Sequence, residues 1–149
     1  MAANRGRITQ RSDRSTSWQP RPARAVGYLR AAVGLGLIMA PKAVARLQAD
    51  QSPTGTAVLL IRTIGIRDLV LGAGTVAAAQ AVGDEGVRSW ITFGLLSDAL
   101  DVVAGAISGS LVGRKAAFTA AGVPVPFVLA DLWALGHLRS QRDAPPQQV

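Results

Sequence analysis

Thr63-Ile64-Gly65-Ile66-Arg67-Asp68-Leu69-Val70-Leu71-Gly72 is a stretch in which two opposite charges stand side by side in a run otherwise apolar enough for a lipid bilayer. A charged side chain at the centre of a bilayer costs about 3 kcal/mol or more, so such charges need partners. Two other apolar runs offer them, because one contains Asp98 and Asp101 and the other contains Asp131. The sequence therefore predicts a small polytopic membrane protein with a buried network of charges.

The composition agrees with this class. Of the 149 residues, 49% are hydrophobic, and the mean hydropathy of +0.28 is high for one soluble domain of this size. Most apolar residues are small or aliphatic, which favours closely packed helices over a bulky aqueous core. The chain has no cysteine and one histidine, His137, so we expect no disulfide, metal site or cofactor.

The formal charge of +7 is concentrated in residues 1–24, which hold six arginines among Ser, Thr, Gln and Pro. This segment has too few apolar residues to fold alone, so we expect a disordered basic arm. A basic arm before an apolar helix is typical of a cytoplasmic flank attracted to anionic lipid. Nucleic acid is the weaker alternative, because Trp18 is the single aromatic residue among these arginines. We expect residues 139–149 to be a disordered tail.

Four apolar segments lie between the arm and the tail, and we predict helices at about 25–45, 55–82, 90–112 and 116–138. Turn-forming residues separate them at 51–55, 83–86 and 113–115. Short connections make consecutive helices antiparallel. The predicted fold is thus an all-α, antiparallel four-helix transmembrane bundle over residues 25–138. Together the arm, the second loop and the tail hold far more Lys and Arg than the first and third loops, which carry two each. This predicts a multi-pass protein of the cell membrane with both termini cytoplasmic.

Two structural alternatives stay open. The first apolar segment resembles a signal peptide, because a basic lead and a short apolar core precede Ala43-Val44-Ala45. Lys42 and the later apolar segments count against this interpretation. A soluble helical bundle is the second alternative, because several segments are rich in alanine and interrupted by charges.

The charges within the apolar segments form the candidate site. With a rise of about 1.5 Å per residue, Asp68 and Asp101 lie at similar depth in antiparallel helices, and Asp98 shares a helical face with Asp101. The predicted intramembrane polar network comprises Arg30, Arg62, Arg67, Asp68, Asp98, Asp101 and Asp131. Three arginines against four aspartates leave one carboxylate without a cation.

Glycines accompany these charges at spacings of three and four residues. The stripes are Gly27-Arg30-Gly34, Gly65-Asp68-Gly72 and Gly94-Asp98-Asp101-Gly105. Glycine faces are where membrane helices approach one another, so we expect the charged groups to point toward neighbouring helices and the segment 90–112 to be centrally packed. Pro124-Val125-Pro126 should kink the last helix and open a small cavity above Asp131.

Three of these motifs resemble those of a known family. The residues at 65–72, at 96–101 and at 28–34 are similar to an uncharacterised actinobacterial family of small four-helix membrane proteins, domain of unknown function 4267. The resemblance covers about residues 25–138 and implies the same membrane topology, but no activity, substrate or cofactor. Fourteen arginines against two lysines agree with a GC-rich bacterial source.

The sequence favours a structural role for the charge network, in which ion pairs fix the register of the helices. The first alternative is a proton or ion pathway ending near Arg62, which would require an oligomer because four helices enclose little space. A lesser alternative is a Mg²⁺-dependent enzyme acting on a lipid or isoprenoid through Asp98-x-x-Asp101. Enzyme activity is therefore the less favoured class, and the expected partners are membrane lipids and further copies of the chain.

Overall fold

The computed structural model describes residues 22–48 and 54–142. Within these ranges the chain is helical and contains no strand, which confirms the all-α class. The helices are α1 (Pro22–Met39), α2 (Pro41–Gln48), α3 (Gly55–Ala81), α4 (Asp84–Ile107), α5 (Gly109–Val112), α6 (Arg114–Gly122) and α7 (Val125–Arg142).

The predicted arm and tail fall mostly outside the described residues, at 1–21 and 143–149. Where the chain is described, the helices extend further than we expected. Pro22 begins α1, as proline commonly does at the first position of a helix, and α7 continues to Arg142.

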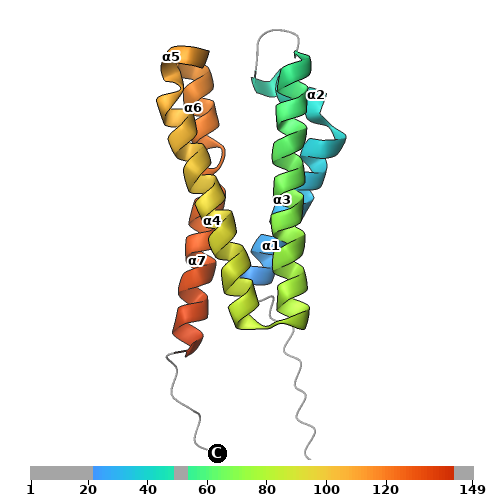
Figure 1. The fold of residues 1–149 in the computed structure, drawn as a ribbon, viewed down its shortest axis with the longest axis vertical. Coiled ribbons are helices and arrows are strands. Elements are labelled where there is room, and N and C mark those ends of the chain that lie inside the picture. Colours follow the sequence, from blue (N-terminus) through green and yellow to red (C-terminus); the bar gives the residue numbers. More distant parts are fainter. Residues whose placement is uncertain (1–21, 49–53, 143–149) are drawn as a thin grey trace, which may run out of the picture.

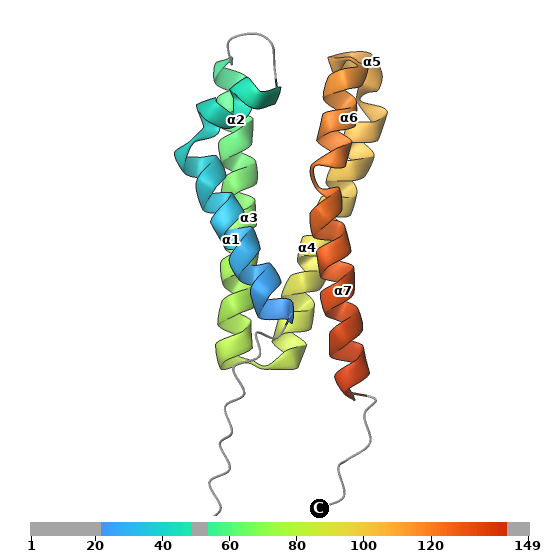
Figure 2. The same ribbon diagram turned by 180° about the vertical axis from the view of Figure 1, so that it is seen from behind.

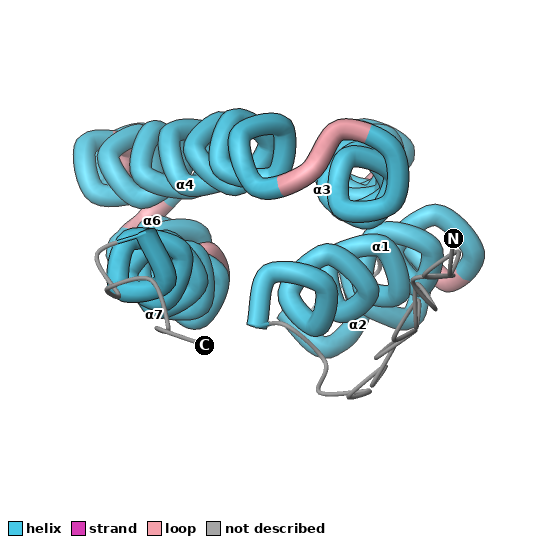
Figure 3. The backbone as a smooth tube through the Cα atoms, turned by 90° about the horizontal axis from the view of Figure 1, so that it is seen from below, coloured by secondary structure: helices cyan, strands magenta, loops and turns pink. Residues whose placement is uncertain are grey.

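The long helices contact one another in a ring in which α1 packs on α3, α3 on α4, α4 on α7 and α7 on α1. Figure 3, seen along the long axis, shows these helices at four corners. The contact between α1 and α3 is the most extensive, and α4 also packs on α6. The start of α1, the end of α7 and the turn at Gly83 lie toward one end (Figures 1 and 2), while α2 and α5 lie at the other, where the two halves diverge.

Three of the four predicted helices are interrupted, which corrects the sequence prediction. The helix predicted at 90–112 is broken at Ser108, between α4 and α5. The first ends at Met39, and Pro41 starts a separate helix, because proline has no backbone N–H to donate into the preceding turn. The last is divided between α6 and α7 at Val123 and Pro124, where Phe127 and Val128 begin a new set of hydrogen bonds to the Pro124 carbonyl. The predicted proline kink is thus confirmed as a complete break.

The glycines at the predicted turns are confirmed by their backbone geometry. Gly83, between α3 and α4, has φ +88°, and Gly113, between α5 and α6, has φ +87°. Side chains other than glycine rarely adopt this left-handed region, so both turns depend on the missing Cβ.

Glycine also sets the distance between α1 and α3. A Cβ added to Gly34 would lie 2.6 Å from the carbonyl oxygen of Gly65, and one added to Gly72 would lie 2.5 Å from that of Gly27. Both distances are too short for real atoms, so the two backbones touch directly along this seam. The predicted glycine stripes therefore do mark helix contacts, and a similar approach occurs between Gly105 of α4 and the backbone of Ala121 in α6.

The interior contains small and charged residues with a few larger apolar ones, while most of the large apolar side chains lie outside. The largest side chains that are fully buried are Ile91, Asp98 and Asp131. Leucines, isoleucines and phenylalanines of every long helix are exposed, among them Leu59, Leu60, Ile66, Phe93, Leu96, Leu100, Leu129 and Leu132. A soluble domain buries most residues of this kind in its core.

Two helical stretches within the described residues are long and apolar enough to cross a membrane, Asp84–Ile107 and Ala117–Arg142. The other two segments that we predicted to cross do not meet this criterion. Arg67 and Asp68 lower the mean hydropathy in the middle of α3, and α1 contains Arg24 and Arg30. The expectation of four membrane spans therefore requires that the charged side chains of α1 and α3 be paired with charges on other helices.

Candidate functional site

Arg30 is the centre of the charge network. It lies midway along α1 on the glycine face, and its side chain is 2% exposed. Its Nη2 donates to Asp98 Oδ2 at 2.6 Å and to Asp131 Oδ2 at 2.8 Å, and its Nη1 donates to Asp68 Oδ1 at 3.4 Å. One arginine of α1 therefore binds carboxylates from α3, α4 and α7.

Aromatic contact adds a fourth partner to this arginine. The guanidinium carbon of Arg30 lies 4.6 Å from the centroid of the Phe127 ring on α7. A cation over an aromatic face is attracted by the negative face of the ring, by about 2 kcal/mol when the pair is desolvated. Arg30 thus touches α7 through Phe127 and through Asp131, one helical turn apart.

Arg67 is the second cation of the network and lies closer to solvent. Its Nη1 donates to Asp101, its Nε and Nη2 donate to Asp68 Oδ1 at 3.3 and 3.2 Å, and Nη2 also approaches Asp98 Oδ1 at 3.4 Å. All three nitrogens of this guanidinium therefore have carboxylate partners. The ion pair between Arg67 and Asp101 connects α3 with α4.

The network has a sealed layer and an exposed layer. Arg30, Asp98 and Asp131 are almost fully buried, whereas the side chains of Arg67 and Asp101 are 28% and 37% exposed. Asp68 and Asp98 join the layers because each contacts both arginines. The ion pairs form a continuous path from Asp101 at the exposed side to Asp131 in the interior.

The structure brings together six of the seven predicted residues. Arg62 is the exception: it is exposed on α3 and makes no ion pair within the described part of the chain. The count of charges changes accordingly. Two arginines meet four aspartates, so the formal charge of the network is −2 rather than the −1 that our counting predicted.

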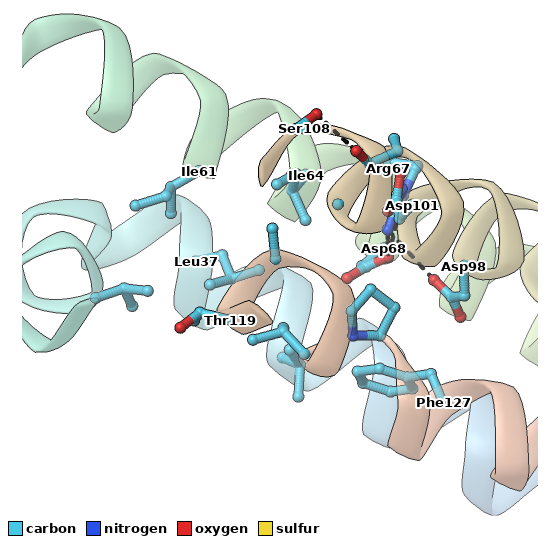
Figure 4. Close-up of a pocket in the computed structure, with 17 residues that line it drawn as sticks. Leu37, Ile61, Ile64, Arg67, Asp68, Asp98, Asp101, Ser108, Thr119 and Phe127 are labelled. Carbon is cyan, nitrogen blue, oxygen red and sulfur yellow. Dashed lines mark hydrogen bonds and ion pairs between the residues drawn. The ribbon is translucent and has the colours of Figure 1, made fainter. Parts of the chain in front are cut away.

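A cavity of about 520 Å³ lies against the exposed layer. Its lining comes from α1, α2, α3, α4, α6 and α7, and it includes the charged residues Arg67, Asp68, Asp98 and Asp101. Figure 4 shows these charges gathered at one end of the cavity, with Leu37 and Ile61 toward the other end. Pro124 lines the cavity, so the predicted opening at the proline break is present, although Asp131 itself is not part of the wall.

On the opposite side of the network, apolar residues close the structure. A cluster of buried side chains from α1, α3, α4 and α7 fills the end that holds the Gly83 turn, and it comprises Ala23, Val26, Ala78, Val87, Ile91, Ala134 and Leu138. The buried Thr75 hydroxyl donates to the Leu71 carbonyl within its own helix. The path of charged groups therefore ends at Asp131.

Sequence reasoning missed Phe127 and the role of Arg24. Phe127 precedes Asp131 by four residues and so shares its helical face, a signal that could have placed the ring beside the network. Arg24, which we assigned to the arm, donates to the Ala79 carbonyl at 3.0 Å. Cations near the last turn of a helix satisfy its free carbonyls, so Arg24 caps the end of α3.

No three acidic or histidine side chains in the described ranges lie close enough together to hold a metal ion. The aspartates of the network face guanidinium groups rather than a shared point between them. Comparison with known proteins adds no relative, because no family model, curated protein or solved structure matches this chain.

Proposed function

We propose that this chain is a small multi-pass protein of the bacterial cell membrane in which the Arg/Asp network is structural. The observation that carries this proposal is the position of Arg30, whose guanidinium binds carboxylates of three other helices. Breaking such a buried pair costs about 3–5 kcal/mol, because a charge is left without a partner. The network would thereby specify which helices are neighbours and in what register.

The distribution of side chains supports the membrane setting over a soluble bundle. Large apolar side chains cover the outside, and glycine, alanine and paired charges occupy the contacts between helices. Lipid tails offer no hydrophobic force that would push these large residues inward, whereas close approach of small residues is favoured. In this proposal α1 and α3 cross together with α4 and the α6–α7 segment, and the charges that lower their hydropathy are hidden at the helix contacts.

We propose the orientation from the distribution of basic residues. The start of α1, the Gly83 turn and the end of α7 lie toward the same end of the structure (Figure 1). The arm, the second loop and the tail carry most Lys and Arg, which favours the cytoplasm for this end. Contact of the arm with anionic lipid, which involves residues outside the described ranges, and formation of a homo-oligomer belong to the same proposal.

A proton or ion pathway is the second candidate, and one observation favours it: the ion pairs are continuous from the cavity to Asp131. The apolar cluster beyond Asp131 counts against a complete path, because the buried Thr75 hydroxyl on that side already donates to the Leu71 carbonyl of its own helix. Arg62, which we had placed on such a path, is outside the network. A role for Asp98 and Asp101 in Mg²⁺ catalysis has no comparable support, since both bind arginine.

The test is a charge exchange between α3 and α4. Arg67→Asp and Asp101→Arg, each alone, place like charges against one another and should lower both the folded yield and the melting temperature in detergent micelles. The double variant restores this one opposite pair and should recover part of both, although Asp68 and Asp98 still lose Arg67 as a partner. If the double variant is as unstable as the sum of the single ones, the ion pair does not hold these helices together. If all three variants melt like the wild type, the structural role is wrong.

A further inference from the structure

The cavity beside the network has apolar walls and a charged end. Val33, Leu37, Val44, Ile61 and Ile64 line one side, while the residues Arg67, Asp68, Asp98 and Asp101 meet at its end. Pockets of about 300–1,000 Å³ enclose most of the surface of a drug-sized molecule, and a volume of about 520 Å³ falls in this range. The cavity thus suits one molecule with an apolar body and a charged group.

The sign of that charge follows from the hydrogen bonds. The charged residues in the wall are one arginine and three aspartates, with a formal sum of −2. All three nitrogens of Arg67 already donate to carboxylates, so the arginine has little left to offer an anion. Asp101, by contrast, accepts through Oδ2 alone within the described residues, and its side chain is 37% exposed. The unused acceptor capacity of Asp101 and the negative formal charge of the cavity wall therefore favour the binding of a cation.

We infer that this cavity is a binding site for an amphiphilic organic cation, with the cationic group at Asp101 and the apolar body between the helix pairs. A cation at this position reduces the uncompensated negative charge of the network, while its apolar body replaces lipid or detergent against the walls. This site goes beyond the structural role of the ion pairs: it shares Asp101 with Arg67 and leaves the contacts of Arg30 unchanged.

The probe is a pair of ions with the same shape and opposite charge, tetraphenylphosphonium and tetraphenylborate. Equilibrium dialysis against the full chain in micelles of a neutral detergent measures saturable binding of each, with empty micelles subtracted. We expect the cation to bind with one site per chain and the anion to show no saturable binding. Equal saturable binding of both ions, or none by the wild type, would overturn the inference.

Variants locate the site. Asp101→Asn keeps the shape of the side chain and removes one accessible charge, so we expect the cation to bind at least about tenfold more weakly. Ala104→Phe fills the cavity from α4 and should abolish saturable binding, whereas Ala106→Phe, two residues on and outside the cavity lining, should retain it. Should Asp101→Asn fail to fold, the two phenylalanine variants still decide the question. Undiminished binding by Ala104→Phe, or equal loss in both phenylalanine variants, would place the cation elsewhere.

Discussion

The guanidinium carbon of Arg30 on α1 lies 4.6 Å from the centroid of the Phe127 ring on α7. The first and last described helices are therefore joined by a cation–π contact as well as by the ion pair to Asp131. The ring also lines the cavity, where it covers one side of the charged groups. This contact has a measurable contribution of its own, because the ring can be removed without changing any charge.

Phe127→Leu keeps an apolar side chain but removes the aromatic face. We expect the free energy of unfolding to fall by about 1–2 kcal/mol through loss of the cation–π attraction. Phe118→Leu is the matched control, because Phe118 on α6 is exposed and should show little change. Reversible unfolding in mixed micelles measures both. Equal effects of the two substitutions would show that the Phe127 ring contributes no more than an exposed one, so that the cation–π contact does not stabilise the fold.

Arg30→Met should be the most damaging substitution of an arginine in this chain. It leaves three aspartates without their common partner, at a cost of about 3–5 kcal/mol. Arg62→Met removes an exposed arginine that has no ion pair within the described residues, and we expect a change within about 0.5 kcal/mol. Melting temperatures in the same detergent compare the two. A similar melting temperature for both variants would contradict the central position of Arg30.

Two glycines of α1 provide a test of the seam with α3. An added Cβ at Gly34 would lie 2.6 Å from the Gly65 carbonyl oxygen, whereas one at Gly36 would meet nothing within 4 Å. We therefore expect Gly34→Ala to destabilise the fold by about 1–3 kcal/mol through overpacking. Gly36→Ala should stabilise it by up to about 1 kcal/mol, because alanine favours the helix. Opposite signs of the two changes in unfolding free energy are the expected result. A loss for Gly34→Ala no larger than that for Gly36→Ala would show that α1 and α3 are not in backbone contact.

The orientation can be tested with two cysteines, since the chain has none of its own. Ser110 in α5 and Ser140 in α7 are both exposed and lie at opposite ends of the structure. In intact bacterial cells, a membrane-impermeant maleimide should label Ser110→Cys and should label Ser140→Cys only after the cells are broken. Labelling of both from outside, or the reverse pattern, would contradict the proposed topology.

The parts of the fold that sequence predicted are those that depend on neighbours along the chain. The turns at Gly83 and Gly113 follow from local residue types, and the glycine faces follow from the helical repeat. The Arg67–Asp101 pair was also accessible, because short connections make α3 and α4 adjacent and antiparallel.

Other features depend on angular position or on distant elements. Arg62 precedes Asp68 by six residues, which at 3.6 residues per turn places the two side chains about 120° apart around the helix. The position of Arg62 along the helix suggested that it belongs to the network, but its direction around the helix excludes this. The contact of Arg30 with Asp131 requires knowing that α1 and α7 are neighbours, and no short loop joins them. The break at Pro41 could be anticipated from the chemistry of proline, but the apolar character of residues 25–45 led us to predict one continuous helix.

The position of Arg30 also constrains the order in which the chain can be assembled during synthesis. Its helix leaves the ribosome before α3, α4 and α7, and the three carboxylates that surround its guanidinium are translated 38, 68 and 101 residues later. Inserting an unpaired arginine at the centre of a bilayer costs about 3 kcal/mol of free energy. In the proposed membrane setting, α1 on its own is therefore expected to stay at the membrane surface. Asp68 on α3 gives it a first partner, and Asp131 on α7 completes the set. In the proposed membrane setting, α1 is thus made before its three partner helices but reaches its final environment only after the last of them.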